Sequence, residues 1–373
     1  MSAFTLPNNH KPFTDAYFLH SRNILERDGL NPMVTYEVFI RNGPGEVRGV
    51  DEAVAMIDTY APELAARGGS VHALPEGSRY EGGEPLMHIR GPVQDLIELE
   101  TMYLGVLAAE TTRANAGHGV DLEQVAERAR KIRELCPDKE LIYFGSRHWR
   151  YDDDAAISKA VLEQGWDGAS TEVGARAGGF SHGLGTIPHA LVLIYAHAFG
   201  RETATLKATD AFNRNIDKSV PRIALVDSFN REIDDTLATA RALGEDLYAV
   251  RLDTPGEHPA QGADPEDRDA DIYNGFWGGS GVTVSGTKAM REALDAAGFE
   301  HVNIVLSSGF GELDKVQAFL EGERRHGRLF EAMGIGGLFP AWHATSDIVQ
   351  VEGRDLAKEG RGYRANPRMV RML

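Results

Sequence analysis

Two carboxylates stand at the ends of neighbouring apolar runs in the middle of the chain. Asp227 follows Leu225-Val, and Asp253 follows Arg251-Leu. Residues two apart on a strand point to the same face, so Arg251 and Asp253 are expected to share one. Such a pair can fix a sugar diol while the arginine neutralises negative charge, and a fixed carboxylate stabilises a developing cation. For Asp227 a plain helix cap is the alternative interpretation.

An aromatic residue and an arginine lie close together at the end of an earlier apolar run. Phe144 is followed by Gly-Ser-Arg147, and Ser170 ends the next run with a hydroxyl group. A planar anionic ring can stack on the phenylalanine while its carboxylate or phosphate pairs with the arginine. The alternative is a core aromatic residue beside a surface arginine.

One histidine and a set of glycines have positions that suit phosphate chemistry. His189 follows Pro188 at the start of an apolar helix, where the positive end of the dipole favours a neutral, nucleophilic imidazole. Gly336 and Gly337 close the last apolar run, and adjacent glycines let backbone N–H groups approach an anion. A structural histidine and a tight turn without a ligand are the alternatives.

The elements that carry these residues read as parallel strands. Apolar runs without alternation indicate strands that are covered on both faces, and functional residues belong at their carboxyl ends. We therefore expect an incomplete α/β barrel, with a doubly wound sheet as the rival architecture. The runs span residues 141–147, 166–171, 222–227, 247–253, 302–309 and 330–337.

The first part of the chain has a different pattern. The run 33–40 alternates and is β-branched, which predicts a half-buried strand, and a helix is expected within 93–116. We expect an α+β open-faced sandwich over residues 1–117 and the barrel over 118–340. The tail 341–373 would rejoin the first domain through a strand near 347–354. The segment 254–286 is either a surface insertion or an active-site lid.

Composition excludes several classes of protein. The 373 residues carry a formal charge of −17, which argues against nucleic-acid binding. The longest apolar stretch, Ala190–Ala196, is far shorter than the roughly 20 residues that span a membrane. The start of the chain does not have the pattern of a signal peptide. A single cysteine, Cys136, rules out an internal disulfide framework and suits a reducing compartment, so we expect a cytoplasmic protein.

With these residues in place, the chain resembles the nicotinate phosphoribosyltransferases, and its shorter archaeal-type members most of all. The resemblance covers nearly the whole length, and each motif occurs in the order found in the family. The segments that carry it are Thr14–Phe18, Leu74–Ser78, Glu98–Gly105, Phe144–Arg147, Gly185–His189, Leu225–Ser228, Arg251–Thr254 and Gly334–Gly337.

The resemblance implies an activity and a set of roles. The family joins nicotinate to phosphoribosyl pyrophosphate, usually with help from ATP hydrolysis and Mg²⁺, and works as a homodimer or larger assembly with the site at the subunit interface. Here it implies that Tyr17 of a partner subunit and Phe144 sandwich the pyridine ring, and that Arg147 and Arg251 hold anionic groups. Asp253 would grip the ribose, and Gly309, Gly336 and Gly337 would cradle the 5′-phosphate. The resemblance also implies that His189 is phosphorylated, that Asp227 orients His189 or nearby ribosyl and metal-bound oxygens, and that Ser170 selects the acid over the amide.

Two departures from the family pattern leave alternatives open. Pro255-Gly-Glu-His-Pro replaces a Ser-rich, arginine-bearing loop, so Arg150, Arg176 or Lys207 would have to assist pyrophosphate. Ser307-Ser-Gly309 replaces the usual Ser-Gly-Gly. The zinc-binding cysteines of some archaeal relatives are missing, so no zinc is expected. Quinolinate phosphoribosyltransferase, nicotinamide phosphoribosyltransferase and a degenerate nucleotide-binding relative remain the alternatives.

Overall fold

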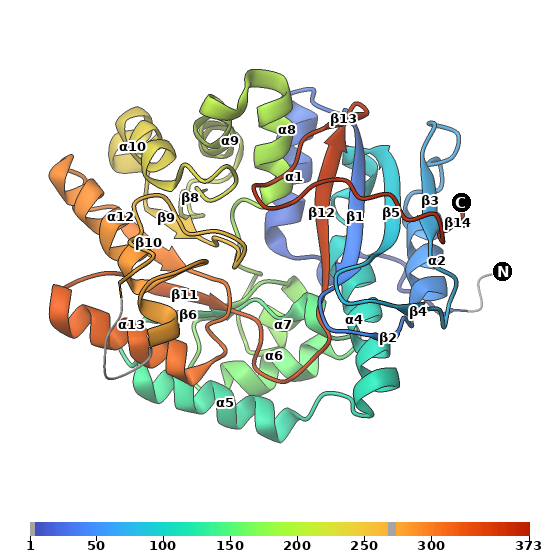
Figure 1. Ribbon diagram of the computed structural model, residues 1–373, viewed down its shortest axis with the longest axis horizontal. Helices are drawn as coiled ribbons and strands as arrows, with labels where there is room; N and C mark the ends of the chain where they lie inside the picture. Colours follow the sequence, from blue (N-terminus) through green and yellow to red (C-terminus); the bar gives the residue numbers. More distant parts are fainter. Residues whose placement is uncertain (1–3, 268–273) are drawn as a thin grey trace.

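Two six-stranded sheets form the framework of the protein (Figure 1). The structure is a computed structural model that describes residues 4–267 and 274–373. In spatial order the first sheet contains β13 (Arg354–Asp355), β12 (Ala344–Val351), β1 (Met33–Ile40), β5 (Pro85–Pro92), β3 (Ser70–Ala73) and β14 (Val370–Arg371). All of its pairs are antiparallel.

The second sheet is parallel throughout. Its strands, in spatial order, are β7 (Gly168–Ala169), β6 (Glu140–Tyr143), β11 (Ala332–Ile335), β10 (Asn303–Leu306), β9 (Ala249–Leu252) and β8 (Ile223–Leu225). From β8 to β11 each strand pairs with the next along the chain, and β11 then pairs with β6, the first strand of this sheet. This progression is that of a barrel, with β7 and β8 as the two edges of the gap. The predicted α/β class and the six predicted strands are confirmed.

Helices cover both sheets. The barrel helices lie outside the parallel strands, as the lower and left parts of Figure 1 show. The helices are α1 (Ala16–Arg27), α2 (Val50–Tyr60), α3 (Val93–Leu96), α4 (Glu100–Ala116), α5 (Leu122–Leu135), α6 (Asp154–Leu162), α7 (Glu172–Ala177), α8 (His189–Phe199), α9 (Arg201–Asn215), α10 (Glu232–Leu243), α11 (Asn274–Trp277), α12 (Val284–Ala296) and α13 (Leu313–His326). The remaining elements are a two-stranded sheet of β2 (Gly45–Glu46) and β4 (Arg79–Tyr80), and the 3₁₀ turns η1 (Lys11–Phe13), η2 (Ser146–His148) and η3 (Gly244–Asp246).

The C-terminal part of the chain returns to the first sheet, as expected. β12 pairs with β1 along nearly its whole length, and the final strand β14 pairs with β3. The expectation that β1 is half buried is wrong, because all of its residues except Met33 are buried. The reason is its central place between β5 and β12. A sequence pattern shows alternation but not what covers the second face.

Hydrophobic packing does not separate at residue 117. The core around the first sheet also contains residues of α8 and α9, such as Leu191 and Phe212, which follow the first barrel strands in the chain. A second core fills the parallel sheet and its outer helices. The division into domains at 117 and 340 therefore stays a prediction. In the part of the chain that the structure describes, no helix is long and apolar enough to cross a membrane.

A close approach between α4 and η2 sets the two sheets relative to each other. Gly105 lies in the middle of α4, and a Cβ atom at this position would overlap the backbone oxygen of Trp149. The segment that approaches α4 here follows β6 directly and carries Arg147 and His148. Gly105 thus lets a helix of the first part of the chain lie against the first strand end of the barrel.

We expect Gly105→Ala to destabilise the protein although alanine is the better helix former. Alanine gains about 1 kcal/mol of helix propensity over glycine, whereas overpacking costs about 1–3 kcal/mol. Because the obstructing atom belongs to the backbone, the cost should exceed the gain. The midpoint of thermal unfolding should fall by a few degrees. An equal or higher midpoint would show that α4 can move away from Trp149.

Candidate functional site

A cavity of about 500 Å³ lies between the carboxyl ends of the parallel strands and the first sheet. Tyr36 of β1 and Thr345 of β12 line it from the first sheet. Phe144, Asp253 and Gly336 line it from residues that follow β6, β9 and β11. This is the edge where ligands bind in parallel α/β folds, and a volume of this size holds a small substrate.

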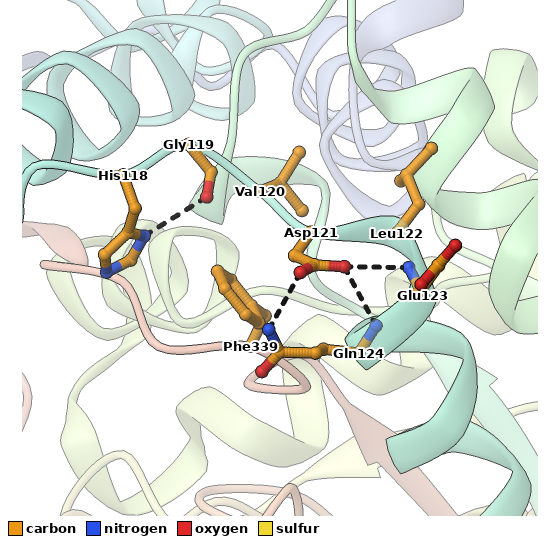
Figure 2. Close-up of a pocket in the computed structure, with 8 residues that line it drawn as sticks. All are labelled: His118, Gly119, Val120, Asp121, Leu122, Glu123, Gln124 and Phe339. Atoms are coloured by element: carbon orange, nitrogen blue, oxygen red, sulfur yellow. Dashed lines mark hydrogen bonds between the residues drawn. The ribbon is translucent and has the colours of Figure 1, made fainter.

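A second hollow lies at the start of α5 (Figure 2). It is lined by the turn that begins at His118 and by Phe339, and it shares no residue with the cavity. Asp121 accepts hydrogen bonds from the backbone amides of Glu123 and Gln124, at 3.0 and 3.1 Å. Its carboxylate therefore caps the helix, as N-terminal aspartates commonly do, and we assign this hollow no chemistry.

Two aromatic residues line the cavity from different parts of the same chain. The ring of Phe144 lies so close to Gly334 that a Cβ atom there would overlap it. Tyr17 accepts a hydrogen bond from Arg147, with 3.0 Å between Nη1 and the hydroxyl oxygen. Burial raises the pKa of Tyr17 well above its ordinary value, although Arg147 opposes this, so the phenol stays neutral.

The expectation that a partner subunit supplies Tyr17 does not describe this structure, where Tyr17 lines the cavity of its own chain. The start of α1 is tied to the end of β7: Ala16 N donates to the oxygen of Ser170 at 2.8 Å, and Asp15 forms a bridge with Thr171. These backbone contacts bring Tyr17 to the barrel without a second copy.

Glu100 is a buried carboxyl group beside Arg147. It begins α4, lines the cavity and lies 3.5 Å from Nη1 of Arg147. Burial raises the pKa of Glu100 to about 8, although Arg147 lowers it, while Asp347 and Asp15 raise it further. Glu100 is therefore protonated at neutral pH, when it can donate a hydrogen bond.

Arg251 is the one arginine of the cavity wall that has no partner. Its residue is only 8% exposed, and its Nε atom is buried without a hydrogen bond; within residues 4–267 and 274–373 the guanidinium makes no ion pair. Asp253 lines the same cavity, as the two-residue spacing predicts, whereas Leu252 does not. An unpaired buried cation costs several kcal/mol, so Arg251 marks a place for an anion.

His189 belongs to a buried polar cluster next to the cavity. Its Nε2 lies 3.0 and 3.1 Å from the two carboxylate oxygens of Asp227. The ammonium group of Lys358 lies 2.7 Å from Asp227 and 2.9 Å from the same Nε2. Asp227 itself does not line the cavity, whereas His189 and Lys358 do. Asp227 thus reaches the cavity only through these two partners.

The loops after β10 and β11 pack against each other through glycines. A Cβ atom on Gly311 would overlap the carbonyl of Gly337, and one on Gly336 would overlap His148. Gly309 has a φ of 82°, which favours glycine. All these residues line the cavity, and Gly336 and Gly337 form the turn after β11. Backbone amides in such a turn suit a phosphate.

One lysine and two histidines stand beside these glycine loops. Lys315 donates to the backbone oxygen of Ser308 at 2.8 Å, and burial lowers the pKa of Lys315 to about 8. His343 and His148 lie edge to face with ring centroids 3.9 Å apart. Burial, and then Arg147, lowers the pKa of His343 to about 4, so this imidazole is neutral at physiological pH.

Ser170 does not reach the cavity. The residue is fully buried, and its hydroxyl lies 3.3 Å from that of Ser146. The start of the chain lies against this strand end: Asp15, just before α1, forms a bridge with Thr171, and Ala16 N donates to the oxygen of Ser170. The role of Ser170 in choosing between acid and amide stays a prediction, and the structure gives it no direct route to a ligand.

The three basic residues expected to assist pyrophosphate are not in the cavity wall. Arg150 is held by Glu52 and Glu110, and Arg176 is an exposed residue that pairs with Glu172. Lys207 is exposed on α9. The basic residues that do line the cavity are Arg41, Arg147, Arg251, Lys358 and Arg361.

Sequence reasoning missed Lys358, Glu100 and His343. Lys358 follows a strand of the first sheet and meets His189 across 169 positions of the chain. No local periodicity or spacing signals such a contact. Glu100 stands in a segment that carries the family resemblance, so its acidic side chain before the apolar residues 102–109 was an available signal.

Comparisons with known proteins agree with this geometry. Residues 15–110 match the family model of the quinolinate phosphoribosyl transferase N-terminal domain. The nicotinate phosphoribosyltransferase pncB1 of Mycobacterium tuberculosis is 25% identical over 398 aligned positions, which cover 97% of this chain and 78% of that one. The pncB2 protein of the same organism, also a nicotinate phosphoribosyltransferase, is 27% identical over 255 positions that cover 68% of this chain and 45% of that one.

Solved structures share the fold. The crystal structure of nicotinate phosphoribosyltransferase from Porphyromonas gingivalis has a TM-score of 0.66 at 14% identity, covering 95% of this chain and 93% of that one. The corresponding structure from Vibrio cholerae has a TM-score of 0.64 at 16% identity, covering 93% and 87%. At these identities the likeness concerns the arrangement of the elements.

The protonation of Glu100 predicts a pH-dependent stability difference. The folded protein holds a proton up to about pH 8 that the unfolded chain releases near pH 4.5. Stability relative to Glu100→Gln should therefore fall by about 1.4 kcal/mol per pH unit between these values. Denaturant unfolding at pH 5, 6.5 and 8 measures this. Glu163→Gln, at an exposed position, is the control and should show no such slope. A flat difference for Glu100→Gln would mean that Glu100 is ionised in the folded protein.

Proposed function

We propose that this chain, which belongs to the nicotinate and quinolinate phosphoribosyltransferase superfamily, forms nicotinate mononucleotide and pyrophosphate from nicotinate and phosphoribosyl pyrophosphate. The single observation that carries the proposal is Arg251, a buried guanidinium that faces the cavity without a partner in the described residues. The carboxylate of nicotinate supplies the missing negative charge. A charge-assisted hydrogen bond of this kind is worth about 1.5–3 kcal/mol.

The charge inventory of the cavity favours one carboxylate over two. Arg147 is engaged by Tyr17 and Glu100, and Lys358 is paired with Asp227. Arg41 and Arg361 pair with Glu257. Among the arginine and lysine side chains of the cavity wall, Arg251 alone has no polar partner in the described residues, which suits a pyridine monocarboxylate.

Quinolinate is the second candidate substrate. The observation that favours it is the match of residues 15–110 to the N-terminal domain of quinolinate phosphoribosyl transferases. Its second carboxylate would need another guanidinium, and Arg147, which contacts Tyr17, is the one that lies beside an aromatic residue of the cavity. Recruiting Arg147 would leave Glu100 and Tyr17 without their cationic partner. We therefore place quinolinate second.

The chemistry follows from the arrangement. The pyridine nitrogen attacks C1′ of the ribose, the new C1′–N bond forms, and the C1′–O bond breaks with its electron pair leaving on pyrophosphate. Phe144 and Tyr17 would hold the ring, and Asp253 would hold the ribose hydroxyls and stabilise positive charge at C1′. Amides of the loops that contain Gly309, Gly336 and Gly337 would bind the 5′-phosphate.

Magnesium fits this cavity as an ion that the phosphates bring with them. Within the described residues no group of three or more histidine, cysteine or acidic side chains is placed to hold a metal. Mg²⁺ commonly binds through substrate phosphates and waters with only one or two protein carboxylates. When bound, it would neutralise the leaving pyrophosphate.

ATP assistance is part of the proposal through His189. Its imidazole lines the cavity at the start of α8; Nε2 contacts Asp227, and no described residue makes a hydrogen bond with Nδ1. Nδ1 would take the γ-phosphoryl group from ATP, whose leaving group is ADP, and water would later release phosphate.

Two further proposals rest on the resemblance to the family. We propose a homodimer or larger assembly, although Tyr17 serves the cavity of its own chain in this structure. We also propose a cytoplasmic location, with the lone Cys136 buried and reduced.

Purified protein should form nicotinate mononucleotide from nicotinate, with much less product from nicotinamide or quinolinate. Arg251→Met should raise the KM for nicotinate by about 10- to 100-fold, since it removes the charge that pairs with the carboxylate. Arg176→Met, on the surface, is the matched control. Chromatographic measurement of the mononucleotide and of pyrophosphate tests both statements. Preference for quinolinate, or an unchanged KM in Arg251→Met, would contradict the assignment.

His189→Ala should remove the stimulation of transfer by ATP, because no other imidazole contacts Asp227 in the described chain. The quantity to measure is the ratio of initial rates with and without ATP, together with ³²P incorporation from γ-labelled ATP. The expected ratio is one, with no label on the protein. Full stimulation in His189→Ala would refute the phosphohistidine.

A further inference from the structure

A segment near the C-terminus crosses from the first sheet to the barrel. We call residues 356–361 the C-terminal strap. Leu356 N donates to the oxygen of Val349 in β12 at 3.1 Å, and Glu359 N donates to the oxygen of Ser228 just after β8 at 2.9 Å. In Figure 1 this red segment leaves β13, passes the barrel side of the molecule and then runs back towards β14. The strap is thus tied to both halves.

Lys358 is the one strap side chain that enters the polar cluster of His189. The residue is 6% exposed, and its ammonium group lies within hydrogen-bonding distance of three groups. These are Asp227 at 2.7 Å, Nε2 of His189 at 2.9 Å and the backbone oxygen of Asp253 at 3.2 Å. The strap therefore delivers a buried cation to the ends of β8 and β9.

The contacts of this cluster favour one placement of the proton on His189. An ammonium group can only donate and an ionised carboxylate can only accept. If Nε2 of His189 were unprotonated, its lone pair would face the oxygens of Asp227 at 3.0 and 3.1 Å. If Nε2 carries the proton, it donates to Asp227, while Lys358 donates to Asp227 and to the oxygen of Asp253. Nε2 and Nζ, 2.9 Å apart, are then two donors that share the carboxylate of Asp227 as their acceptor, and Nδ1 keeps its lone pair.

The charge of Lys358 decides whether the imidazole can stay neutral. Burial acts to raise the pKa of Asp227, but His189 and Lys358 together hold it well below its ordinary value. Asp227 is fully buried, and a buried carboxylate needs a counter-charge. With Lys358 present, the ammonium supplies it. Without Lys358, the only other partner of Asp227 among the described residues is His189, which would have to become an imidazolium and lose its lone pair.

We propose that Lys358 is a positioning residue that neutralises Asp227 and thereby keeps His189 as the neutral Nε2–H tautomer with Nδ1 free for phosphoryl transfer. The inference rests on the proposed function for the use of Nδ1, but the tautomer itself does not depend on it. It also gives the strap a task. The strap links the first sheet to the nucleophile of the barrel, so its displacement would remove the cation.

The test compares Lys358→Met, Lys358→Arg and, as a matched control, Lys207→Met on the exposed face of α9. Long-range ¹H–¹⁵N spectra of histidine-labelled full-length protein distinguish the two neutral tautomers from the imidazolium. The His189→Ala spectrum identifies the His189 signals, and circular dichroism verifies that each variant is folded. The rate ratio with and without ATP is measured on the same samples.

In the unsubstituted protein, Lys358→Arg and Lys207→Met, we expect a protonated Nε2 and an unprotonated Nδ1 at neutral pH. In Lys358→Met we expect an imidazolium signal and at least a tenfold loss of ATP stimulation. An Nδ1–H tautomer in the unsubstituted protein, or unchanged His189 signals in Lys358→Met, would overturn the inference. Absence of any phosphoribosyl transfer would instead reject the proposed function and leave the tautomer result standing.

Discussion

The structure depends on one buried guanidinium without a polar partner inside an acidic protein. The chain has a net charge of −17, yet the cavity holds a guanidinium, that of Arg251, with no counter-ion among the described residues. Burying an ion without a partner costs several kcal/mol. Proteins retain such groups where a ligand completes them, and the arrangement around Arg251 is complete only when an anion is present. Phe144, Tyr17 and the loops that contain Gly309, Gly336 and Gly337 line the same cavity and would hold the rest of that ligand.

Hydrogen bonds or ion pairs engage the other arginine and lysine side chains that line the cavity, and these contacts set the chemistry of the carboxyl groups. Glu100 remains protonated because burial outweighs the attraction of Arg147. Asp227 remains ionised because it has two partners, His189 and Lys358. Two buried carboxyl groups of the same molecule therefore have opposite protonation states, because an ammonium group lies 2.7 Å from Asp227, whereas the guanidinium beside Glu100 is 3.5 Å away.

The sequence predicted the barrel well, because its signal is local. Each apolar run became a parallel strand, and the residues that end the runs, such as Phe144 and Asp253, line one cavity. Carboxyl ends of parallel strands necessarily meet at one edge, so motif positions were enough. Ser170 is an exception: it is fully buried where Asp15, just before α1, bridges to Thr171. Local patterns could not predict features that depend on contacts between distant parts of the chain. These are the burial of β1, the position of Tyr17 and the return of Lys358 to the barrel.

A crystal structure of the protein with nicotinate mononucleotide would test directly whether Arg251 binds the carboxylate of the ligand. We expect the pyridine ring between Phe144 and Tyr17, its carboxylate within hydrogen-bonding distance of Arg251, and the phosphate on the amides around Gly309 and Gly337. A nucleotide bound with its carboxylate away from Arg251, or outside this cavity, would contradict the central claim.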